Sequence, residues 1–337
     1  MTRTRDLRVI DRGGGMKTRL LRDIEVSEVG MGCMAFSHGY GQIPPEEYSV
    51  EAIRNAYRNG CTFFDTAEIY SPNLSGIGHN ERIVGKALHG VREQVVIATK
   101  LFLNGFEAIG RGSVYNAVRR HLEGSLKRLG TDWVDIYYLH RMGGVSVEKI
   151  AEAMGRLMED GLIRGWGLSQ VDVPVIKKAN RVTPLLAVQN IYSMVERDAE
   201  QGVIPYCLEN NIGFVPFSPI ASGLLSGKIT VDTQFERHDD VRNWVPQLSK
   251  ANIAGNQPII DLLKKYAEMK NATSAQISLA WMLHKYPNVV PIPGSKNKER
   301  IVENLDASKV ELTDEEFRSL EEALDGCRVY GHRGFHR

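Results

Sequence analysis

The 337-residue sequence predicts an α/β fold, a (β/α)₈ barrel with a long loop after its seventh strand and a C-terminal tail over the barrel mouth. Two observations lead to this prediction. Short apolar runs alternate with helical patterns along the whole chain, which implies parallel strands joined by right-handed crossovers. No linker-like segment divides the chain, and its length suits one barrel of roughly 250 residues with insertions.

Each expected strand is a short apolar run bounded by polar or turn-forming residues. Three of these runs lead directly into reactive side chains, in CTFFDT, IATK and YYLH. The eight strands are expected at residues 26–34, 61–66, 95–100, 134–140, 163–169, 185–190, 213–219 and 289–294.

A helical segment follows each strand except where a long insertion intervenes. Segment 46–60 has apolar residues at helical spacing and ends at Gly60. In segment 113–130, Ser113 is the expected N-cap and Gly130 the expected stop. Helices are therefore expected at residues 46–60, 80–90, 113–130, 146–161, 172–180, 202–211, 298–305 and 313–324.

Three segments fall outside this alternation. Residues 1–16 are charged and lack the apolar core of a signal peptide, so we expect an extension before a single domain at 17–337. Segment 221–257 is long for a βα connection and is expected to act as a lid or a cofactor loop. The tail at 325–337 is expected to fold over the barrel mouth.

Composition excludes several classes of function. Lys plus Arg is 42 and Asp plus Glu is 41, a net charge of +1 that suggests neither nucleic acid nor a membrane surface as partner. No apolar run approaches the ~20 residues that span a bilayer. The four cysteines are widely spaced without a CxxC pair, so we expect a reduced, cytoplasmic protein without structural zinc.

Reactive side chains stand at three consecutive strand ends. Asp65 ends the second strand and Tyr70 lies in the loop after it, while Lys100 and His140 end the third and fourth strands. Each alone has an ordinary explanation: a helix cap, packing, a solvated lysine or a structural histidine. Because strand ends converge on one barrel mouth, their joint placement favours a catalytic site.

The four residues form a coherent proton-donating set. A buried lysine beside a phenol stabilises phenolate and lowers the Tyr70 pKa, and Asp65 is the carboxylate that should hold Lys100. His140 could orient and polarise a carbonyl, and Tyr70 could give a proton to its oxygen while hydride reaches its carbon. This chemistry requires no metal.

Hydride transfer needs a cofactor, and no GxGxxG pattern of the dinucleotide-binding kind follows a strand here. The later strand ends offer another surface. Ser169 and Gln170 end the fifth strand, and Gln189 and Asn190 end the sixth, which suits a carboxamide. Phe217 ends the seventh strand and could stack on a flat ring.

Two further segments suit phosphate groups. The small residues at 218–228 offer backbone N–H groups for a pyrophosphate. After the eighth strand, Ser295, Lys296 and Arg300 stand near a helix start, where barrels commonly bind phosphate. A solvated basic helix start is the alternative interpretation of these three residues.

The sequence resembles the aldo-keto reductase superfamily from about residue 17 onward, and most of all its microbial and plant branch. The matching stretches are FFDTAEIY, GKAL, VVIATK, SLKRLGTDWVDIYYLHR, IRGWGLSQ, VQNIYS, PFSPIASGLLSGK and PGSKNKERIVENL. The resemblance implies a barrel that binds NADPH in an extended form and reduces an aldehyde or ketone.

The resemblance also implies roles for individual residues. Tyr70 would be the acid, tuned by Lys100 and Asp65, with His140 orienting the substrate. Phe36, His38 and Tyr40 are expected to face the substrate. NADPH, rather than NADH, is expected to contact Gly32, Cys33, Met34, Ser169, Gln170, Gln189, Phe217, Ser218, Pro219, Ile220, Gly223, Leu225, Lys228, Gly294, Ser295, Lys296, Arg300, Glu303 and Asn304.

The sequence departs from the family pattern around the substrate. Phe217 stands where Tyr is usual, Gln170 where Asn or an acidic residue is usual, and RMGGVSVE follows His140 where an Asp-Pro pair is common. The loop after Tyr70 is also longer than usual. Because of these departures, the sequence does not identify the carbonyl substrate. It does not indicate the oligomeric state either.

Two other classes of function stay open at this point. Some relatives with this barrel serve mainly as nucleotide-binding regulatory subunits, with little turnover. A phosphate-substrate isomerase or aldolase would instead use Lys100 as a Schiff-base amine.

Overall fold

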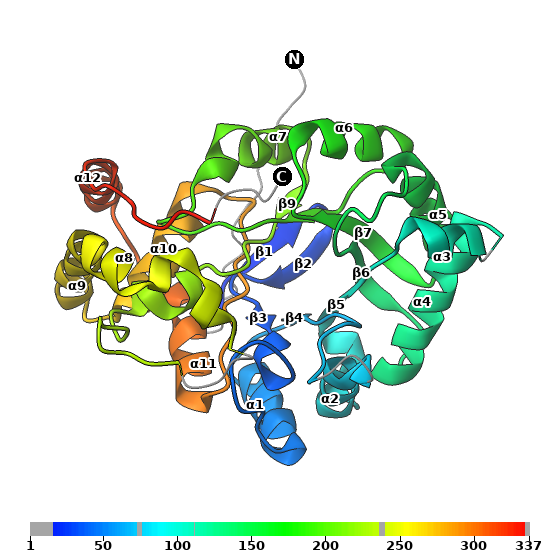
Figure 1. Ribbon diagram of the computed structural model, residues 1–337, viewed down its shortest axis with the longest axis horizontal. Coiled ribbons are helices and arrows are strands. Elements are labelled where there is room, and N and C mark those ends of the chain that lie inside the picture. The colour runs from blue at the N-terminus through cyan, green and yellow to red at the C-terminus, as the bar shows by residue number, and fades with distance from the viewer. Residues whose placement is uncertain (1–15, 73–75, 111, 236–239, 334–337) are drawn as a thin grey trace.

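The computed structural model describes residues 16–72, 76–110, 112–235 and 240–333. Within them, parallel strands stand side by side in chain order, which confirms the predicted βα alternation (Figure 1). The strands are β3 (Met31–Gly32), β4 (Phe63–Asp65), β5 (Val96–Leu101), β6 (Val134–Leu139), β7 (Ile163–Ser169), β8 (Ala187–Gln189) and β9 (Gly213–Phe214).

Segment 289–294 closes the barrel, although it forms no regular strand. Isolated parallel bridges join it to Phe214 of β9 on one side and to Gly32 of β3 on the other. Pro291 and Pro293 have no amide proton, so this segment cannot donate a continuous ladder of hydrogen bonds. The eighth strand therefore lies where it was predicted, but it makes only isolated bridges to its neighbours.

Helices surround the barrel (Figure 1). Ser113 accepts a hydrogen bond from the Asn116 amide, and Gly130 ends the helix with φ of 67°, as predicted. The helices are α1 (Glu46–Arg58), α2 (His79–Leu88), α3 (Gly105–Gly110), α4 (Val114–Leu129), α5 (Val147–Glu159), α6 (Val173–Val182), α7 (Val203–Glu209), α8 (Lys250–Gly255), α9 (Gln257–Lys270), α10 (Ser274–Lys285), α11 (Lys298–Leu305) and α12 (Asp314–Asp325).

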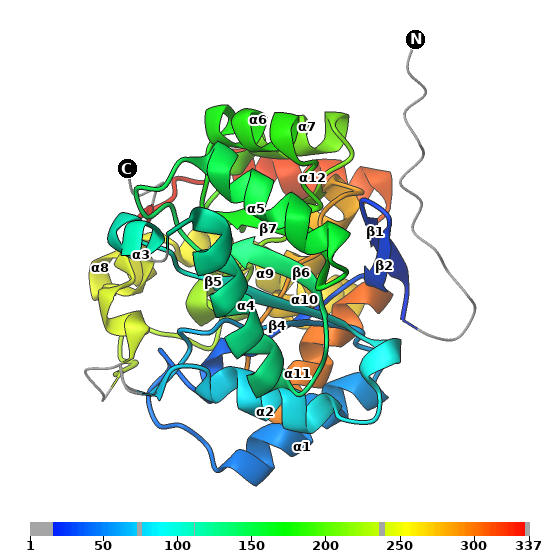
Figure 2. The same ribbon diagram turned by 90° about the vertical axis from the view of Figure 1, so that its right-hand side faces the viewer.

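The prediction of one strand at 26–34 is wrong, because the end of one strand and the whole of another lie in that segment. β1 (Thr18–Leu21) and β2 (Ile24–Ser27) form an antiparallel hairpin, and β3 is a separate short strand. Figure 2 shows the hairpin at the end of the barrel opposite to α8. Leu21, Ile24 and Val26 are buried there with the barrel interior, so the hairpin closes this end of the core.

Strand side chains alternate between the barrel interior and the layer beneath the helices. Val96 and Ala98 of β5, and Ile136 and Tyr138 of β6, belong to the interior cluster. Because side chains repeat every two residues along a strand, the next interior positions are those that follow at the mouth. Lys100 on β5 and His140 just after β6 occupy these positions.

Glycine makes room for one aromatic ring inside the barrel. A Cβ atom at Gly167 would lie 2.4 Å from the ring of Tyr138, which is fully buried. Only glycine therefore fits at this point of β7, and the interior below the mouth is filled by Tyr138.

The long loop after β9 and the C-terminal tail both reach the mouth, as predicted. The loop contains the 3₁₀ turns Ala221–Ser226, Val241–Trp244 and Pro246–Leu248. The Tyr330 amide donates to Asn256 Oδ1 at 3.0 Å, and Asn256 Nδ2 donates to the Tyr330 carbonyl at 2.9 Å. This reciprocal pair fixes the tail beside α8 and α9.

The predicted N-terminal extension at 1–16 lies outside the described residues except for Met16, which packs against the core. Among the helices that the structure describes, none combines the length and the apolar character needed to cross a membrane.

Candidate active site

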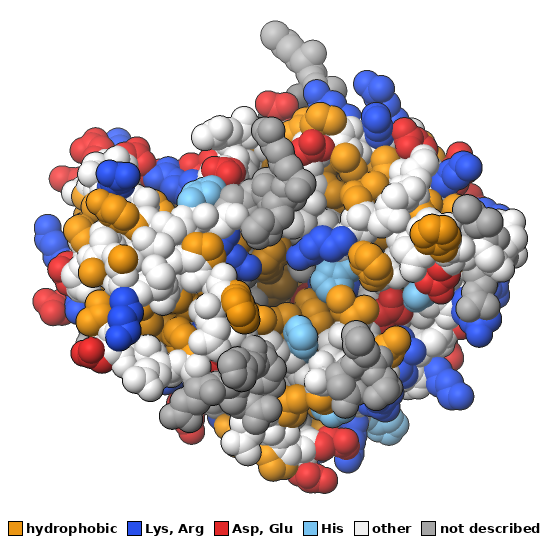
Figure 3. Space-filling model, viewed as in Figure 1, with side chains coloured by type: hydrophobic (Ala, Val, Ile, Leu, Met, Phe, Trp, Pro, Cys, Tyr) orange, Lys and Arg blue, Asp and Glu red, His pale blue; other side chains and the backbone are white. Residues whose placement is uncertain are grey.

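A cavity of about 560 Å³ opens at the C-terminal ends of the strands. Figure 3 shows basic and histidine side chains around the hollow in this face of the molecule. The residues that line it are Gly32, Met34, Ala35, His38, Tyr40, Asp65, Ile69, Tyr70, His140, Arg141, Ser169, Gln189, Phe217, Ser218, Pro219, Ile220, Ser222, Gly223, Ser226, Lys228, Val241, Arg242, Ala275, Ile292, Pro293, Gly294, Ser295, Lys296, Asn297, Arg300, Glu303, Asn304 and Arg333.

Lys100 lies beneath the cavity floor and is fully buried. Its ammonium donates to Asp65 Oδ1 at 2.5 Å, to the Thr66 carbonyl at 2.7 Å and to the Tyr70 hydroxyl at 3.3 Å. Burial lowers the pKa of Lys100, but Asp65 and Tyr70 outweigh it and hold that pKa above its usual value. A protonated, enclosed amine does not suit the Schiff-base alternative.

Asp65 is the last residue of β4 and is 2% exposed. Its second oxygen, Oδ2, accepts a hydrogen bond from Gln189 Nε2 at 2.8 Å. Burial raises the pKa of Asp65, and the charges and hydrogen bonds of Lys100 and Gln189 oppose that rise. The carboxylate is thus held on both oxygens and compensates the buried lysine, as a buried ion requires.

Tyr70 lines the cavity, and its backbone is held on both sides. Its amide donates to the Ala67 carbonyl at 3.2 Å, and its carbonyl accepts from the Asn80 amide at 3.2 Å. The predicted lowering of its pKa is wrong in net direction. Burial raises the pKa of Tyr70, and Lys100 offsets only part of this rise, because desolvation of the phenolate outweighs the nearby cation.

His140 faces the cavity beside Tyr70, with ring centres 5.6 Å apart and ring planes at 82°. Burial lowers the pKa of His140 well below its usual value, and the charges of Lys100 and Arg141 add to this effect. Its ring is therefore neutral near neutral pH. Nδ1 is buried and has no hydrogen-bond partner among the described residues.

The hydroxyl and amide side chains predicted at the fifth and sixth strand ends separate into two groups. Ser169 and Gln189 line the cavity, as does Phe217 after β9. Gln170 instead accepts a hydrogen bond from the Ile191 amide at 3.0 Å, and Asn190 bonds the backbone of Val171. Gln170 and Asn190 therefore connect loops rather than line the cavity.

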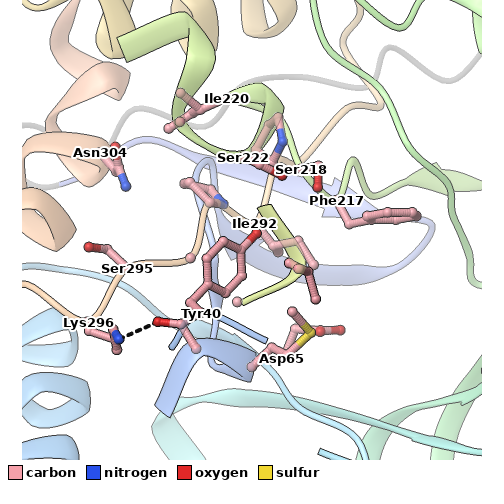
Figure 4. A pocket seen from close by; sticks show the side chains of 18 of the residues that line it. Tyr40, Asp65, Phe217, Ser218, Ile220, Ser222, Ile292, Ser295, Lys296 and Asn304 are labelled. Carbon is pink, nitrogen blue, oxygen red and sulfur yellow. Dashed lines mark hydrogen bonds between the residues drawn. The ribbon is translucent and has the colours of Figure 1, made fainter. Parts of the chain in front are cut away.

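The loop after β9 has an unusual backbone. Ser218, Ala221 and Ser222 have φ of 51°, 48° and 55°, and Gly223 has φ of 101°. Non-glycine residues rarely adopt left-handed φ, and such residues gather at ligand-binding segments. Ser218, Ile220 and Ser222 stand together on one wall of the cavity in Figure 4.

Ser295, Lys296 and Arg300 line another part of the cavity, together with Asn304. Lys296 Nζ donates to the carbonyls of Tyr40, at 2.6 Å, and Gln42, at 2.8 Å (Figure 4). Its ammonium therefore connects the loop after β3 to the segment before α11. Arg300 is exposed at the cavity rim and can reach an incoming anion without breaking an ion pair among the described residues.

Some predicted contacts do not reach the cavity. Phe36, expected at the substrate, and Cys33 and Leu225, expected at the cofactor, are fully buried and lie outside the lining. These corrections have one cause, since each side chain packs into the hydrophobic layer behind the cavity wall. Gln170, also expected at the cofactor, instead bonds the Ile191 amide, whereas His38, Tyr40 and the other residues expected at the cofactor do line the cavity.

Three arginines at the cavity were not predicted. Arg141 follows His140 directly, Arg242 lies in the long loop, and Arg333 lies in the tail. The adjacency of Arg141 to His140 was a signal in the sequence. Arg242 and Arg333 depend on how distant segments fold back over the mouth, which no local pattern shows.

The arrangement can protonate an oxygen. Tyr70 carries a hydroxyl that stays protonated at neutral pH, Lys100 supports its conjugate base, and His140 is a neutral group beside it. Among the described residues, no three His, Cys, Asp or Glu side chains gather where they could hold a metal ion.

Comparison with known proteins gives consistent matches. Residues 28–325 match the model of the aldo/keto reductase family. A probable aldo-keto reductase of Glycine max is 34% identical over 92% of this chain and 88% of its own length. An NADP(+) aldo-keto reductase of Schizosaccharomyces pombe is 35% identical over 94% of both chains.

Two solved structures share the fold over most of the chain. A glycerol dehydrogenase of Gluconobacter oxydans is 25% identical, covers 97% of both chains and has a TM-score of 0.79. An aldo/keto reductase of Klebsiella pneumoniae in complex with NADP and acetate is 28% identical, covers 90% of this chain and 93% of its own, and has a TM-score of 0.69.

Proposed function

Because this chain belongs to the aldo/keto reductase family, we propose that it is an NADPH-dependent oxidoreductase that reduces an aldehyde or a ketone to the alcohol. The observation that carries this proposal is the chain of contacts from Asp65 through Lys100 to Tyr70, with His140 beside the phenol. The names of the relatives support the cofactor, since one is an NADP(+) enzyme and another was solved with NADP.

The donor groups of the cavity suit NADPH. Ser169 and Gln189 would hold a carboxamide, and Phe217 would stack against the attached ring. The left-handed backbone of the loop after β9 would turn N–H groups toward the pyrophosphate. Ser295 and Arg300 would bind the 2′-phosphate, which favours NADPH over NADH.

The chain's own residues would manage the oxygen of the substrate. NADPH, when bound, supplies the hydride that the carbonyl carbon receives. Tyr70 donates its proton to the carbonyl oxygen, so that a neutral alcohol forms, and Lys100 stabilises the resulting phenolate.

His140 would orient the same oxygen. Its buried Nδ1 has no partner among the described residues, and burying an unpaired acceptor costs less than burying an unpaired N–H group. The proton of the neutral ring is therefore better placed on Nε2, where it can be donated to the carbonyl.

The direct test is consumption of NADPH, and separately of NADH, against a panel of aldehydes and ketones. We expect turnover of several carbonyls with NADPH and lower kcat/KM with NADH. Tight NADPH binding without turnover of any carbonyl would contradict the proposal and favour a nucleotide-binding regulatory subunit.

A further inference from the structure

The cavity holds two arginines that the proposed reduction does not use. Arg141 enters from the position after His140, and Arg333 enters from the C-terminal tail, almost two hundred residues later in the chain. Within the described residues, no acidic side chain forms an ion pair with either guanidinium. The presence of two guanidinium groups in one cavity without acidic partners therefore needs a physical explanation.

Arg141 is fixed on one nitrogen only. Its Nη1 donates to the His140 carbonyl at 2.6 Å and to Ser169 Oγ at 2.9 Å, and its guanidinium carbon lies 5.8 Å from the centre of the Phe217 ring. Its Nε and Nη2 have no hydrogen-bond partner in the part of the chain that the structure describes. These donors form the open side of a planar fork that suits a carboxylate.

Arg333 is held mainly by its backbone. Its amide donates to Glu196 Oε1 at 2.5 Å, and the neighbouring His332 lies 3.2 Å from the other oxygen of Glu196. The guanidinium makes one long hydrogen bond, from Nη1 to Ser218 Oγ at 3.3 Å. Glu196 thus anchors the tail while the Arg333 charge stays at the cavity.

Three other partly or fully buried arginines are each compensated by an acid. Arg19 pairs with Glu28, Arg128 with Glu81, and Arg242 with Asp240. Burial lowers the pKa of Arg141, and the charge of Arg333 adds to that lowering although Tyr70 opposes it. Both charges lie in one part of the cavity, since Arg141 lies over Phe217 and Arg333 bonds the next residue, Ser218. A bound anion would compensate both guanidinium groups there.

The position of Arg141 favours the substrate over the nucleotide phosphates. Ser295, Lys296 and Asn304 lie across the cavity from Phe217 in Figure 4, on the side where a 2′-phosphate would bind. Arg141 lies instead over Phe217 and bonds the His140 carbonyl, so its free donors stand at the reacting end.

We propose, building on the proposed function, that Arg141 and Arg333 form an anion subsite that selects carbonyl substrates carrying a carboxylate. The carboxylate would accept hydrogen bonds from both guanidinium groups while Tyr70 and His140 hold the carbonyl oxygen. Arg141 is the first residue of RMGGVSVE, the segment where the sequence departs from the family pattern.

A matched pair of substrates tests this subsite. 4-Carboxybenzaldehyde and its methyl ester differ in the negative charge and by one methyl group, so the change of their kcat/KM ratio between the parent and the arginine variants reports anion recognition. We expect a ratio of about tenfold to a hundredfold in favour of the acid, the range that one hydrogen bond between charged groups contributes.

Substitutions should abolish the preference. Arg141→Gln and Arg333→Gln should each bring the acid-to-ester ratio close to one, and Arg141→Lys and Arg333→Lys should keep part of it. Arg318→Gln, which removes the same charge from the exposed side of α12, should leave the ratio unchanged. Melting curves by circular dichroism identify any variant that fails to fold. If a glutamine variant fails to fold, the acid-to-ester ratio of the corresponding lysine variant tests the subsite instead.

Binding measured without turnover separates this inference from the proposed function. Calorimetric titration with benzoate and with NADP⁺ should show benzoate affinity that falls in both glutamine variants while NADP⁺ affinity falls less. Turnover of neutral aldehydes with no preference for the acid would overturn the subsite. Weakened NADP⁺ binding with an intact acid-to-ester ratio would also overturn it, since the arginines would then serve the nucleotide. Arginine-dependent benzoate binding without any turnover would support the subsite and contradict the reductase.

Discussion

Removal of the buried amine at Lys100 should affect stability and catalysis through the same contacts. Lys100→Met leaves Asp65, which is 2% exposed, with Gln189 as its remaining side-chain partner. Leaving one member of a buried ion pair uncompensated costs about 3–5 kcal/mol, so we expect a loss of this size in the free energy of unfolding. Tyr70 also loses the donor at 3.3 Å that stabilises its phenolate.

Chemical denaturation measures the loss of stability in Lys100→Met, and the pH–rate profile measures the effect on Tyr70. Burial raises the pKa of Asp65, and without Lys100 this rise is larger, so the stability deficit should grow as pH rises through the unfolded pKa of about 4. Turnover should fall by about a hundredfold or more, because the Tyr70 pKa also rises and its conjugate base loses support.

The double variant Asp65→Asn/Lys100→Met provides the control. Removing both charges should restore most of the lost stability but none of the turnover, since the neutral pair needs no compensation. The coupling between Asp65, Lys100 and Tyr70 would be refuted by two results together. The free energy of unfolding of Lys100→Met would stay within about 1 kcal/mol of the parent value, and its pH–rate profile would be unchanged.

Three further predictions concern the cofactor, the histidine and the fold. Arg300→Ala should weaken NADPH binding by about tenfold or more and NADH binding much less, as fluorescence titration would show; equal losses would mean that Arg300 does not contact the 2′-phosphate. Because burial lowers the pKa of His140 well below its usual value, reductase activity should show no inflection near pH ~6.5, and one that His140→Gln removes would contradict the neutral ring. Arg19→Met should lower the free energy of unfolding by about 3–5 kcal/mol, because Glu28 would remain buried and unpaired; a change below about 1 kcal/mol in urea denaturation would contradict this.

Local patterns predicted the barrel and the strand-end residues for a definite reason. Side chains alternate between the two faces of a strand, so the last interior positions of β4 and β5 fall at Asp65 and Lys100. This placement does not depend on the conformation of the loops. The same periodicity could not show that the segment at 26–34 divides into a hairpin strand and β3. Both parts are apolar and extended, and their separation depends on packing against the barrel floor.

Long-range packing decided the remaining features of the site. The pKa of Tyr70 depends on how completely the phenol is enclosed, which the nearby Lys100 could not reveal. Leu225 lies in a motif typical of a cofactor loop, but its side chain faces the core. Arg333 reaches the mouth only because Asn256 and Glu196 hold the tail there.

The most direct test of the proposed mechanism is the kinetics of Tyr70→Phe. This change removes only the hydroxyl that Lys100 contacts at 3.3 Å and leaves the ring beside His140. We predict that kcat for a carbonyl substrate falls by about 10²–10⁴-fold while the Kd for NADPH stays within about twofold. Turnover close to that of the parent enzyme would show that Tyr70 is not the proton donor.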